Sequence, residues 1–367
     1  MDFAARLIQW QQRHGRHDLP WQKSRDPYRV WLSEIMLQQT RVATVVAYFQ
    51  RFLARFPSLS DLARAPLDEV MAAWSGLGYY ARARNLHACA RRLDAEHGGD
   101  FPRTPEAIAA LPGIGRSTAN AIAAFCHGAR VPILDGNVKR VLCRYFGVSG
   151  YPGAAAVEQR LWRLAESLLP QRDIATYIQA QMDLGATLCT RSRPRCEACP
   201  VAVSCVARAE DRIALLPQRR PRRVLPERRV RVLLLADRQR LLLLARPPTG
   251  LWGGLLSLPE LPEGDDPSIH AANCLGCEAT QFEELPPLRH SFTHFHLTLL
   301  PLLAHARPQP RAAERSGETW LGRDDCAAAA LPTPIRKLLQ RFFELSPAPG
   351  AAPGPEPAGE SGRPAIR

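Results

Sequence analysis

The pattern of hydrophobic positions divides the chain into a helical part and a part that contains strands. From residue 1 to about 215, apolar side chains recur with a period near 3.6, and Pro and Gly interrupt the runs at short intervals. The first run, with Phe3, Leu7, Ile8 and Trp10 among polar residues, is an amphipathic helix and not a signal peptide. We therefore expect a mainly α-helical domain over residues 1–216.

Residues 217–229 have a different composition. Their sequence is PQRRPRRVLPERR, with six Arg and three Pro, which is typical of an exposed linker. Such a linker can be a solvated tether or a strap that contacts phosphates, and the composition favours neither.

Beyond the linker the pattern favours a small α+β domain over residues 230–345. Short apolar runs predict three strands and the last run predicts a closing helix: Val230–Ala236, Leu241–Ala245 and His294–Leu303, then Ile335–Leu345. The tail, residues 346–367, is rich in Pro, Ala and Gly and is expected to be disordered.

Charge and cysteine usage narrow the possible partners. The 367 residues carry a net charge of +13 with a pI near 9.7, so we expect an anionic partner. Six cysteines outside the cluster described below have no second metal pattern, although Cys274 and Cys277 form a lone C-x2-C. Free thiols indicate a reducing compartment, and no apolar run is long enough to span a bilayer. The sequence predicts a cytoplasmic protein.

Four cysteines narrow the chemistry further. Cys189, Cys196, Cys199 and Cys205 follow the spacing C-x6-C-x2-C-x5-C. Thiolates this close can hold one metal centre, and sulfur ligands select zinc or an iron–sulfur cluster. Three Arg residues between the first two cysteines make this segment too polar for four unrelated core cysteines. The segment has one C-x2-C pair with a wider gap on each side, whereas a zinc ribbon has two such pairs separated by a long stretch. Zinc stays an alternative.

The segment LPGIGRSTA, residues 111–119, predicts a turn between two helices. Thr104 and Pro105 are an N-cap and first residue for the helix that ends at Leu111-Pro112. Gly113 and Gly115 let the backbone approach a ligand, and the next helix, from Thr118 to about Phe125, offers its N-terminal amides to a phosphate. This is the pattern of a helix–hairpin–helix motif that binds the DNA backbone, or of an ordinary helical hairpin.

Two carboxylates are candidates for catalysis. Asp135 follows the extended run Val131–Leu134 and starts a helix, so it is a natural N-cap as well as a group that can point into a cleft. Glu34 lies on a helix that starts at Asp26-Pro27 and whose core stripe we expect to include Trp31, Ile35, Val42, Val46 and Phe49. With apolar neighbours and no Lys or Arg at i+4, Glu34 is expected to have a raised pKa.

The four motifs WLSEIMLQQTRV (31–42), GLGYYARARNL (76–86), LPGIGRSTA and LDGNVKRV (134–141) occur in order before the cysteine loop. Together they resemble the adenine DNA glycosylase (MutY) family of the endonuclease III, helix–hairpin–helix superfamily, over about residues 10–205. The resemblance implies a 4Fe–4S cluster held by the four cysteines. It also implies base excision repair by a bacterial, nucleoid-associated monomer that removes adenine opposite 8-oxoguanine or guanine in double-stranded DNA.

The resemblance also implies residue roles. Glu34 protonates adenine at N7, Asp135 stabilises the oxocarbenium-like sugar, and Asn137 orients water or Asp135. Four residues match positions that wedge into the base stack, Gln39, Thr40, Leu77 and Tyr79, although Leu77 and Tyr79 could be ordinary core residues. Trp21 and Arg16 match the edge of the base pocket or backbone contacts.

Ser117 is the most diagnostic position. In the strand-cleaving relatives a nucleophilic Lys stands there, and a serine hydroxyl cannot form a Schiff base. Lys139, the nearest other amine, is expected to give adventitious trapping only. The resemblance therefore implies a monofunctional glycosylase.

The segment RPPTGLWGGLLSLPE, residues 246–260, resembles the start of a Nudix domain. The acidic catalytic box of that family does not follow it, so pyrophosphate hydrolysis is not expected. In the adenine DNA glycosylase family that the chain resembles, this domain recognises 8-oxoguanine with a Phe-Ser-His loop. Phe292, Thr293 and His294 align with that loop, with Thr in place of Ser. The three His residues in the segment 290–296 could also lie on a polar strand edge.

Three other functions remain open from the sequence. An endonuclease III-like enzyme that removes oxidised pyrimidines is disfavoured by Ser117 and by the extra C-terminal domain. A non-catalytic DNA-binding or redox-sensing protein would need neither Glu34 nor Asp135. A nucleotide hydrolase would need the missing Nudix box.

Overall fold

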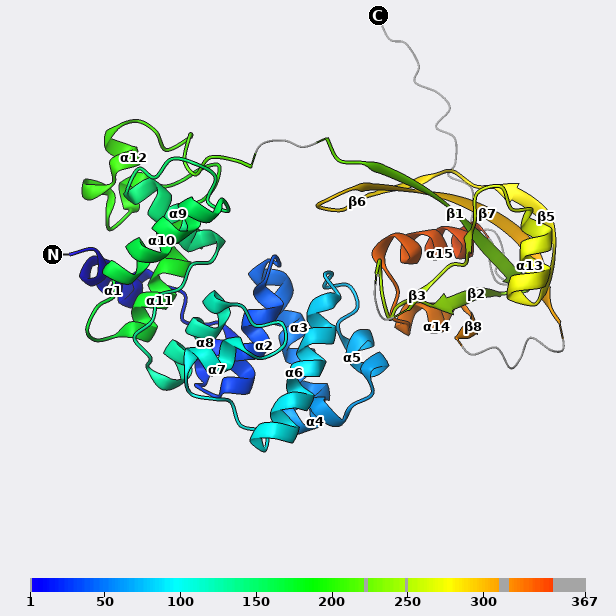
Figure 1. The fold of residues 1–367 in the computed structure, drawn as a ribbon, viewed down its shortest axis with the longest axis horizontal. Coiled ribbons are helices and arrows are strands. Elements are labelled where there is room, and N and C mark those ends of the chain that lie inside the picture. Colours follow the sequence, from blue (N-terminus) through cyan, green and yellow to red (C-terminus); the bar gives the residue numbers. More distant parts are fainter. Residues whose placement is uncertain (1, 221–223, 248–249, 310–316, 346–367) are drawn as a thin grey trace, which may run out of the picture. The chain divides into compact units, whose positions relative to one another are not determined.

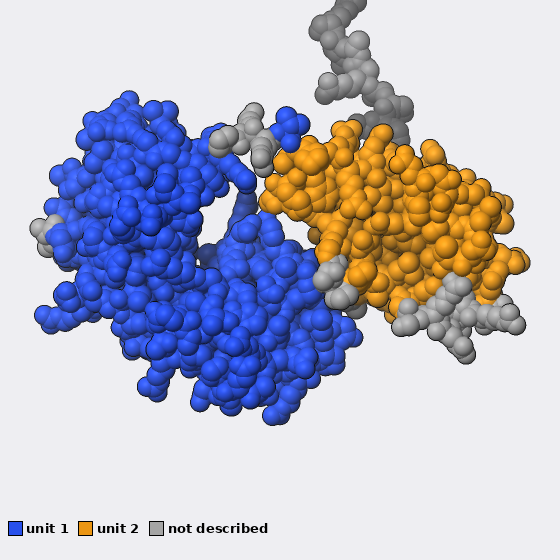
Figure 2. Space-filling model, viewed as in Figure 1, with its two compact units in different colours: residues 1–224 blue, residues 225–367 orange. Residues whose placement is uncertain are grey.

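The computed structural model describes residues 2–220, 224–247, 250–309 and 317–345, and Figure 1 shows its elements. The chain divides into two compact units, Met1–Val224 and Leu225–Arg367, which Figure 2 colours separately. No helix in the described ranges is both long and apolar enough to cross a membrane. The tail, residues 346–367, for which the sequence predicts disorder, lies outside the described residues.

Unit 1 is built from helices and short helical turns. Its elements are α1 (Phe3–His14), η1 (Pro20–Lys23), α2 (Pro27–Leu37), α3 (Val42–Arg55), α4 (Leu59–Arg64), α5 (Leu67–Ala73), α6 (Ala81–His97), α7 (Pro105–Ala109), α8 (Arg116–His127), α9 (Gly136–Tyr145), α10 (Ala155–Ser167), α11 (Ile174–Asp183), η2 (Leu184–Leu188), η3 (Cys196–Ala198), η4 (Ala202–Ser204) and α12 (Val206–Ala209). The amphipathic N-terminal helix is confirmed, since α1 buries Phe3 and Leu7 against α11.

The helix starts predicted from capping residues are confirmed. Asp26 accepts a hydrogen bond from the Tyr28 amide before α2, and Thr104 accepts one from the Ala107 amide before α7. Each side chain satisfies a backbone N–H that the first helical turn leaves without a partner.

The continuous helix expected from Asp26 to Phe49 is wrong. α2 ends at Leu37 and α3 begins at Val42, and the turn between them contains Gln39 at φ 58°. A left-handed residue cannot continue a right-handed helix, so the apolar stripe passes from one helix to the next. This break places Glu34 near the end of α2.

Unit 2 is a mixed sheet with helices on its faces. Its elements are β1 (Glu227–Asp237), β2 (Arg240–Ala245), β3 (Leu256–Ser257), β4 (Glu260–Leu261), α13 (Pro267–Leu275), β5 (Cys277–Glu284), β6 (Leu288–Ser291), β7 (His296–Pro308), β8 (Glu318–Leu321), α14 (Arg323–Ala328) and α15 (Thr333–Leu345). The central order is β3-β2-β1-β7-β5, with β1 and β7 parallel and β6 paired antiparallel to β7.

The two faces of this sheet have separate cores. Val232 and Leu234 of β1 pack with Ile335 of α15, while Leu233 and Leu235 pack with residues of α13. This division follows from the alternation of side chains along a strand. The strands and the closing helix that the sequence predicts are present, but β1 starts at Glu227, so three residues of the predicted linker belong to the sheet.

Candidate active site

Glu34 lies where two cavities of unit 1 meet. One cavity, of about 470 Å³, is lined by residues of α1, η1, α2 and α11, and the other, of about 440 Å³, by residues of α2, α8 and α9. Glu34 and Arg16 line both. We name the first the base pocket and the second the sugar cavity.

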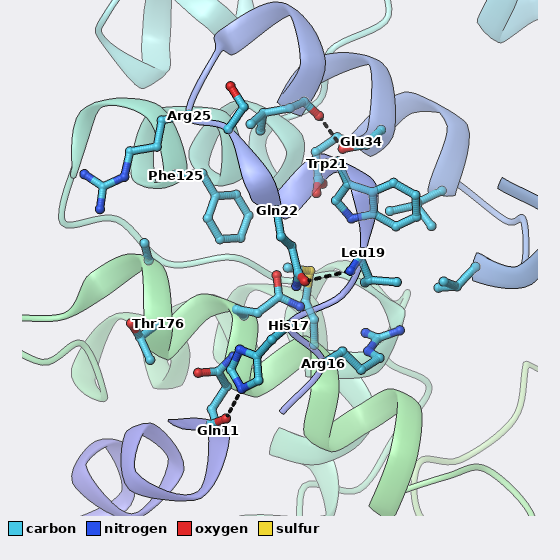
Figure 3. A pocket seen from close by; sticks show the side chains of 18 of the residues that line it. Gln11, Arg16, His17, Leu19, Trp21, Gln22, Arg25, Glu34, Phe125 and Thr176 are labelled. Carbon is cyan, nitrogen blue, oxygen red and sulfur yellow. Dashed lines mark hydrogen bonds between the residues drawn. The ribbon is translucent and has the colours of Figure 1, made fainter. Parts of the chain in front are cut away.

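The base pocket combines aromatic walls with amide side chains. Trp21, Gln22, Phe125 and Glu34 lie around it (Figure 3), and Gln179 of α11 also lines it. Trp21 is fixed by packing edge-on against Phe49 of α3, with ring centroids 5.5 Å apart. Flat apolar walls with a few amides suit a planar heterocycle that is recognised by hydrogen bonds to its edge.

Arg16 is held at the pocket by a buried carboxylate. Its Nε and Nη2 atoms each lie 2.7 Å from Asp183 Oδ1, and its backbone N–H donates to Asp183 Oδ2 at 3.0 Å. Gln179 donates to the same carboxylate at 2.9 Å. Asp183 is fully buried and is therefore paired as a buried charge requires. The pair fixes two pocket-lining side chains.

The sugar cavity contains most of the chemistry-bearing residues predicted from the sequence. Asp135 and Asn137 line it from the start of α9, Ser117 lines it from α8, and Gln39 and Thr40 line it from the turn after α2. The structure thus places both candidate carboxylates around one cavity, although residues 34 and 135 are far apart in the chain.

The two carboxyl groups have different surroundings. Burial raises the pKa of Glu34 to about 7, and the neighbouring Asp135 adds to the rise. Burial also raises the pKa of Asp135, but hydrogen bonds from the Val138 and Asn137 amides and the charge of Arg140 act in the opposite direction. Glu34 is thus favoured as the protonated partner, because its rise comes from desolvation and repulsion alone.

Asp135 is an N-cap whose hydrogen bonds connect it to the cysteine segment. Its Oδ1 accepts from the Val138 amide at 2.8 Å, and its Oδ2 accepts from the Asn137 side chain at 3.2 Å. Arg140 donates to Asn137 Oδ1 at 2.8 Å and to the carbonyl of Cys189 at 2.7 Å. Both sequence interpretations of Asp135, as cap and as cleft carboxylate, are compatible with this geometry.

The hairpin places Ser117 beside the irregular segment that leads to Asp135. Gly113 has φ 75°, and a Cβ there would lie 2.6 Å from the Asn85 Cβ, so both conformation and packing require glycine. Gly115 caps α8 and is exposed. The Ser117 hydroxyl accepts a hydrogen bond from the Leu134 amide at 3.0 Å.

Lys139, the other candidate amine, is paired. Its Nζ lies 2.6 Å from the carboxylate of Glu158 on α10. It is not among the residues that line the sugar cavity.

Of the four predicted wedge residues, two project into solvent, Thr40 is half-buried and Leu77 is buried. Gln39 and Tyr79 are exposed and both have positive φ, 58° and 49°. Leu77 is only 6% exposed, which favours core packing for this residue. Arg82 connects the turn after α2, which contains Gln39, with the turn before α6, which contains Tyr79. It donates to the carbonyls of Gln38 at 2.7 Å and Gly78 at 3.1 Å.

The four cysteines of the C-x6-C-x2-C-x5-C segment line one cavity. In the described ranges no group of three or more His, Cys, Asp or Glu is arranged to hold a metal ion. Arg144 of α9 is buried beside them and donates to Cys189 Sγ at 3.4 Å and to the Thr190 carbonyl at 2.7 Å.

In unit 2 the predicted lesion loop is the tight turn between β6 and β7. The Phe292 amide donates to the Phe295 carbonyl at 2.9 Å, and the two rings stack with centroids 4.6 Å apart. Thr293 and His294 are exposed at the tip. The turn therefore anchors its aromatic residues in the core and presents two polar side chains to solvent.

Sequence reasoning missed part of the base pocket. Gln22, Phe125 and Gln179 line the pocket from three separate elements, and Asp183 holds Gln179 and Arg16 in place; none of them shares a motif with Glu34. The only available signal was Asp183 itself, a carboxylate within an apolar helix that needs a buried cation as its partner.

Comparison with known proteins finds a matching protein family for each unit. Residues 32–167 match the HhH-GPD superfamily of base excision DNA repair proteins, and residues 231–341 match the NUDIX domain family. A thermostable thymine-DNA glycosylase of known structure aligns with a TM-score of 0.52 and 30% identity over 57% of this chain and 95% of its own.

Curated relatives match this chain over nearly its full length or over part of it. The adenine DNA glycosylase of Buchnera aphidicola subsp. Schizaphis graminum is 32% identical over 93% of this chain and 98% of its own length. The human adenine DNA glycosylase is 45% identical over 56% of this chain and 39% of its own.

A helix–hairpin–helix fold with two carboxylates around one cavity defines a base excision repair glycosylase, an enzyme that hydrolyses an N-glycosyl bond. The full-length similarity is more specific than the fold. The chain belongs to the adenine DNA glycosylase family.

Proposed function

We propose that this protein is a monofunctional glycosylase that excises adenine opposite 8-oxoguanine or guanine in duplex DNA. The observation that carries the proposal is the pair Glu34 and Asp135, two carboxylates from distant helices that line one cavity beside an aromatic pocket. One of them has a pKa of about 7, which suits a proton donor at neutral pH.

The two cavities divide the substrate between them. Adenine, flipped out of the duplex, occupies the base pocket against Trp21 and Phe125, with the amides of Gln22 and Gln179 available to its edge. Its deoxyribose lies in the sugar cavity with Asp135 and Asn137. Glu34 lines both cavities and so faces the junction where the glycosidic bond lies.

Bond cleavage then uses the carboxylates in two roles. Glu34 donates its proton to adenine N7, and the electron pair of the C1′–N9 bond leaves with the base. Ionised Asp135 stabilises the oxocarbenium-like sugar, directly or as a covalent acetal, until water adds at C1′. Asn137, which is hydrogen-bonded to Asp135, keeps that carboxylate oriented or positions the water.

Release of the base is proposed without strand cleavage. A lyase needs an amine at C1′, and the hairpin offers only the Ser117 hydroxyl, which is bonded to Leu134. Lys139 is the nearest other amine, and it is paired with Glu158, so we expect it to give adventitious trapping only.

Cys189, Cys196, Cys199 and Cys205 are proposed to hold a 4Fe–4S cluster. The fit rests on four soft donors that line one cavity, with buried Arg144 donating to Cys189 Sγ. Bound there, the cluster supplies structural cross-linking rather than reaction chemistry. Arg144 and Arg140 attach α9, which carries Asp135 and Asn137, to this segment.

Three surfaces are proposed to contact the duplex. Gly113, Gly115 and the N-terminus of α8 bind a phosphate, and Gln39, Thr40 and Tyr79 enter the stack beside the flipped base. Thr293 and His294 read the 8-oxo edge of the opposite base, while Phe292 supports the turn.

One set of duplexes tests the function. The protein is incubated with adenine opposite 8-oxoguanine, adenine opposite guanine, or an oxidised pyrimidine, each with and without alkali. We expect adenine release that yields strand breaks only after alkali. Breaks without alkali on the oxidised pyrimidine would instead indicate an endonuclease III-like lyase.

A further inference from the structure

The α13 face of the sheet in unit 2 changes character along its length. Where α13 covers it, the face is apolar, with Leu233 and Leu235 of β1 and Leu302 of β7 packed together. The covered part ends before the start of β1, and the same face continues there as a row of polar and basic side chains.

Strand register shows which residues share this uncovered end. Arg229 pairs with Thr298 of β7, and Thr298 pairs with Arg289 of β6. Side chains directly opposite one another point to the same face, so Arg229 and Arg289 flank Thr298 at about 10 Å, two strand spacings apart. Arg231, two residues further along β1, lies on this face as well.

These three arginines have no acidic partners that would account for them. Arg229 and Arg289 are exposed and Arg231 is half-buried. In the described part of the chain none of the three forms an ion pair. Three cations that share one open face repel one another, which disfavours their gathering unless an anion binds there.

Two carboxylates at the margin are already engaged. Glu227 accepts a hydrogen bond from the Thr298 hydroxyl at 3.1 Å, and Glu260 is bound to Arg246 at 2.6 Å. A groove of about 500 Å³, which also includes Arg229 and Arg231, extends the surface towards β4. Glu263 also lines this groove and forms no ion pair among the described residues.

The basic face is continuous with the β6–β7 turn. Arg289 precedes the turn on β6 and Thr298 follows it on β7, while the start of β1 runs alongside β7 on the side away from β6, and Figure 1 shows these strands together. Ser291 and His296, the last pair before the turn, are exposed and are hydrogen-bonded to each other at 2.9 Å. The face and the turn therefore form one polar surface of unit 2.

We infer that Arg229, Arg231 and Arg289 form a phosphate-binding face for the DNA backbone next to the base that the β6–β7 turn contacts. The inference rests on the proposed function only in taking duplex DNA as the ligand. It adds a sequence-independent anchor to the turn, since guanidinium–phosphate contacts position a protein on DNA without reading bases.

The test measures the salt dependence of binding in the full-length protein. The variant carries Arg229→Gln, Arg231→Gln and Arg289→Gln, which keep the side-chain stems but remove three charges. The control variant carries Arg238→Gln, Arg307→Gln and Arg341→Gln, three exposed arginines of unit 2 outside this face. The probe is a short duplex with 2′-fluoro-2′-deoxyadenosine, which resists excision, opposite 8-oxoguanine.

We expect the slope of log K against log salt concentration to become shallower by about 2 to 3 in the face variant, because each lost phosphate contact contributes about 0.9. The control variant should keep the wild-type slope. The loss of affinity should be equal opposite 8-oxoguanine and opposite guanine, whereas Thr293→Val should weaken binding opposite 8-oxoguanine more. Thermal unfolding of each variant checks that unit 2 is folded.

The outcomes separate this inference from the proposed function. If the face variant has the same salt slope as the control variant, the inference is overturned. The face would then bind a partner other than DNA, such as an acidic protein. A wild-type protein that releases no adenine overturns the proposed function. In that case a shallower slope for the face variant still supports backbone binding by this surface.

Discussion

Replacing Glu34 by Gln removes a proton donor but keeps the shape and hydrogen-bonding capacity of the side chain. Glu34 lines both cavities, and burial together with Asp135 raises its pKa to about 7 from 4.5. We expect the variant to bind the adenine·8-oxoguanine duplex and to release no adenine, because an amide cannot deliver a proton. The same substitution has a second consequence, for stability.

The magnitude follows from proton linkage. In the folded protein Glu34 keeps its proton up to about pH 7, whereas in the unfolded chain it ionises near pH 4.5. A carboxyl whose pKa is raised by folding therefore lowers stability as pH rises between these values. The difference of about 2.5 between the two pKa values, at 1.36 kcal/mol per unit of pKa, corresponds to about 3 kcal/mol. Water at the pocket mouth reduces this to about 2–3 kcal/mol.

The assay compares urea unfolding of wild type and Glu34→Gln at several pH values from 5 to 8. Because Gln does not titrate, its stability advantage over wild type should grow by about 2 kcal/mol or more across this range and then level off. Glu166→Gln, at an exposed position on α10, is the matched control and should show no such growth. A constant difference between wild type and Glu34→Gln would refute the view that the folded protein holds a proton on Glu34.

Four further outcomes are expected. The single-turnover rate of adenine release should fall as pH rises through about 7, as Glu34 loses its proton, and a rate that stays flat to pH 9 would contradict this. Ser117→Lys should introduce borohydride-trappable strand cleavage, and trapping no greater than in wild type would place Ser117 away from the sugar. Fresh anaerobic protein should contain about four irons and little zinc, with Cys199→Ser lowering the iron content, whereas stoichiometric zinc would overturn the cluster. Truncation after residue 217 should leave a folded glycosylase that loses more activity opposite 8-oxoguanine than opposite guanine, and equal losses would remove lesion reading from unit 2.

Local rules predict those parts of the fold that local interactions determine. Capping by Asp26 and Thr104 satisfies amides a few residues away, so helix starts can be read from sequence. The turn after α2 could not be predicted in this way. Its left-handed residue, Gln39, lies beside carbonyls that accept hydrogen bonds from Arg82, more than forty residues later in the chain.

The start of β1 in unit 2 also depends on residues that are distant in the chain. Composition alone predicts that the linker ends at Arg229, because Arg-rich segments are usually solvated. The structure extends β1 back to Glu227, since its backbone pairs in register with β7 from His296 onward. Backbone pairing does not depend on apolar side chains, so a strand can begin in a segment whose composition predicts none.

The division of roles between Glu34 and Asp135 depends on their hydrogen bonds more than on their depth. Both carboxyls lose water on folding, which alone would favour a proton on each. Asp135 recovers part of that loss, because its carboxylate accepts hydrogen bonds from the Val138 amide and the Asn137 side chain and lies near the charge of Arg140. No hydrogen bond to the Glu34 carboxyl occurs among the described residues, so no donor offsets the rise of its pKa to about 7. When one carboxyl of a close pair is held charged, the other is driven further towards its neutral form. The helix start at Gly136, a feature that the sequence shows directly, thus favours Glu34 over Asp135 as the proton donor in the proposed mechanism.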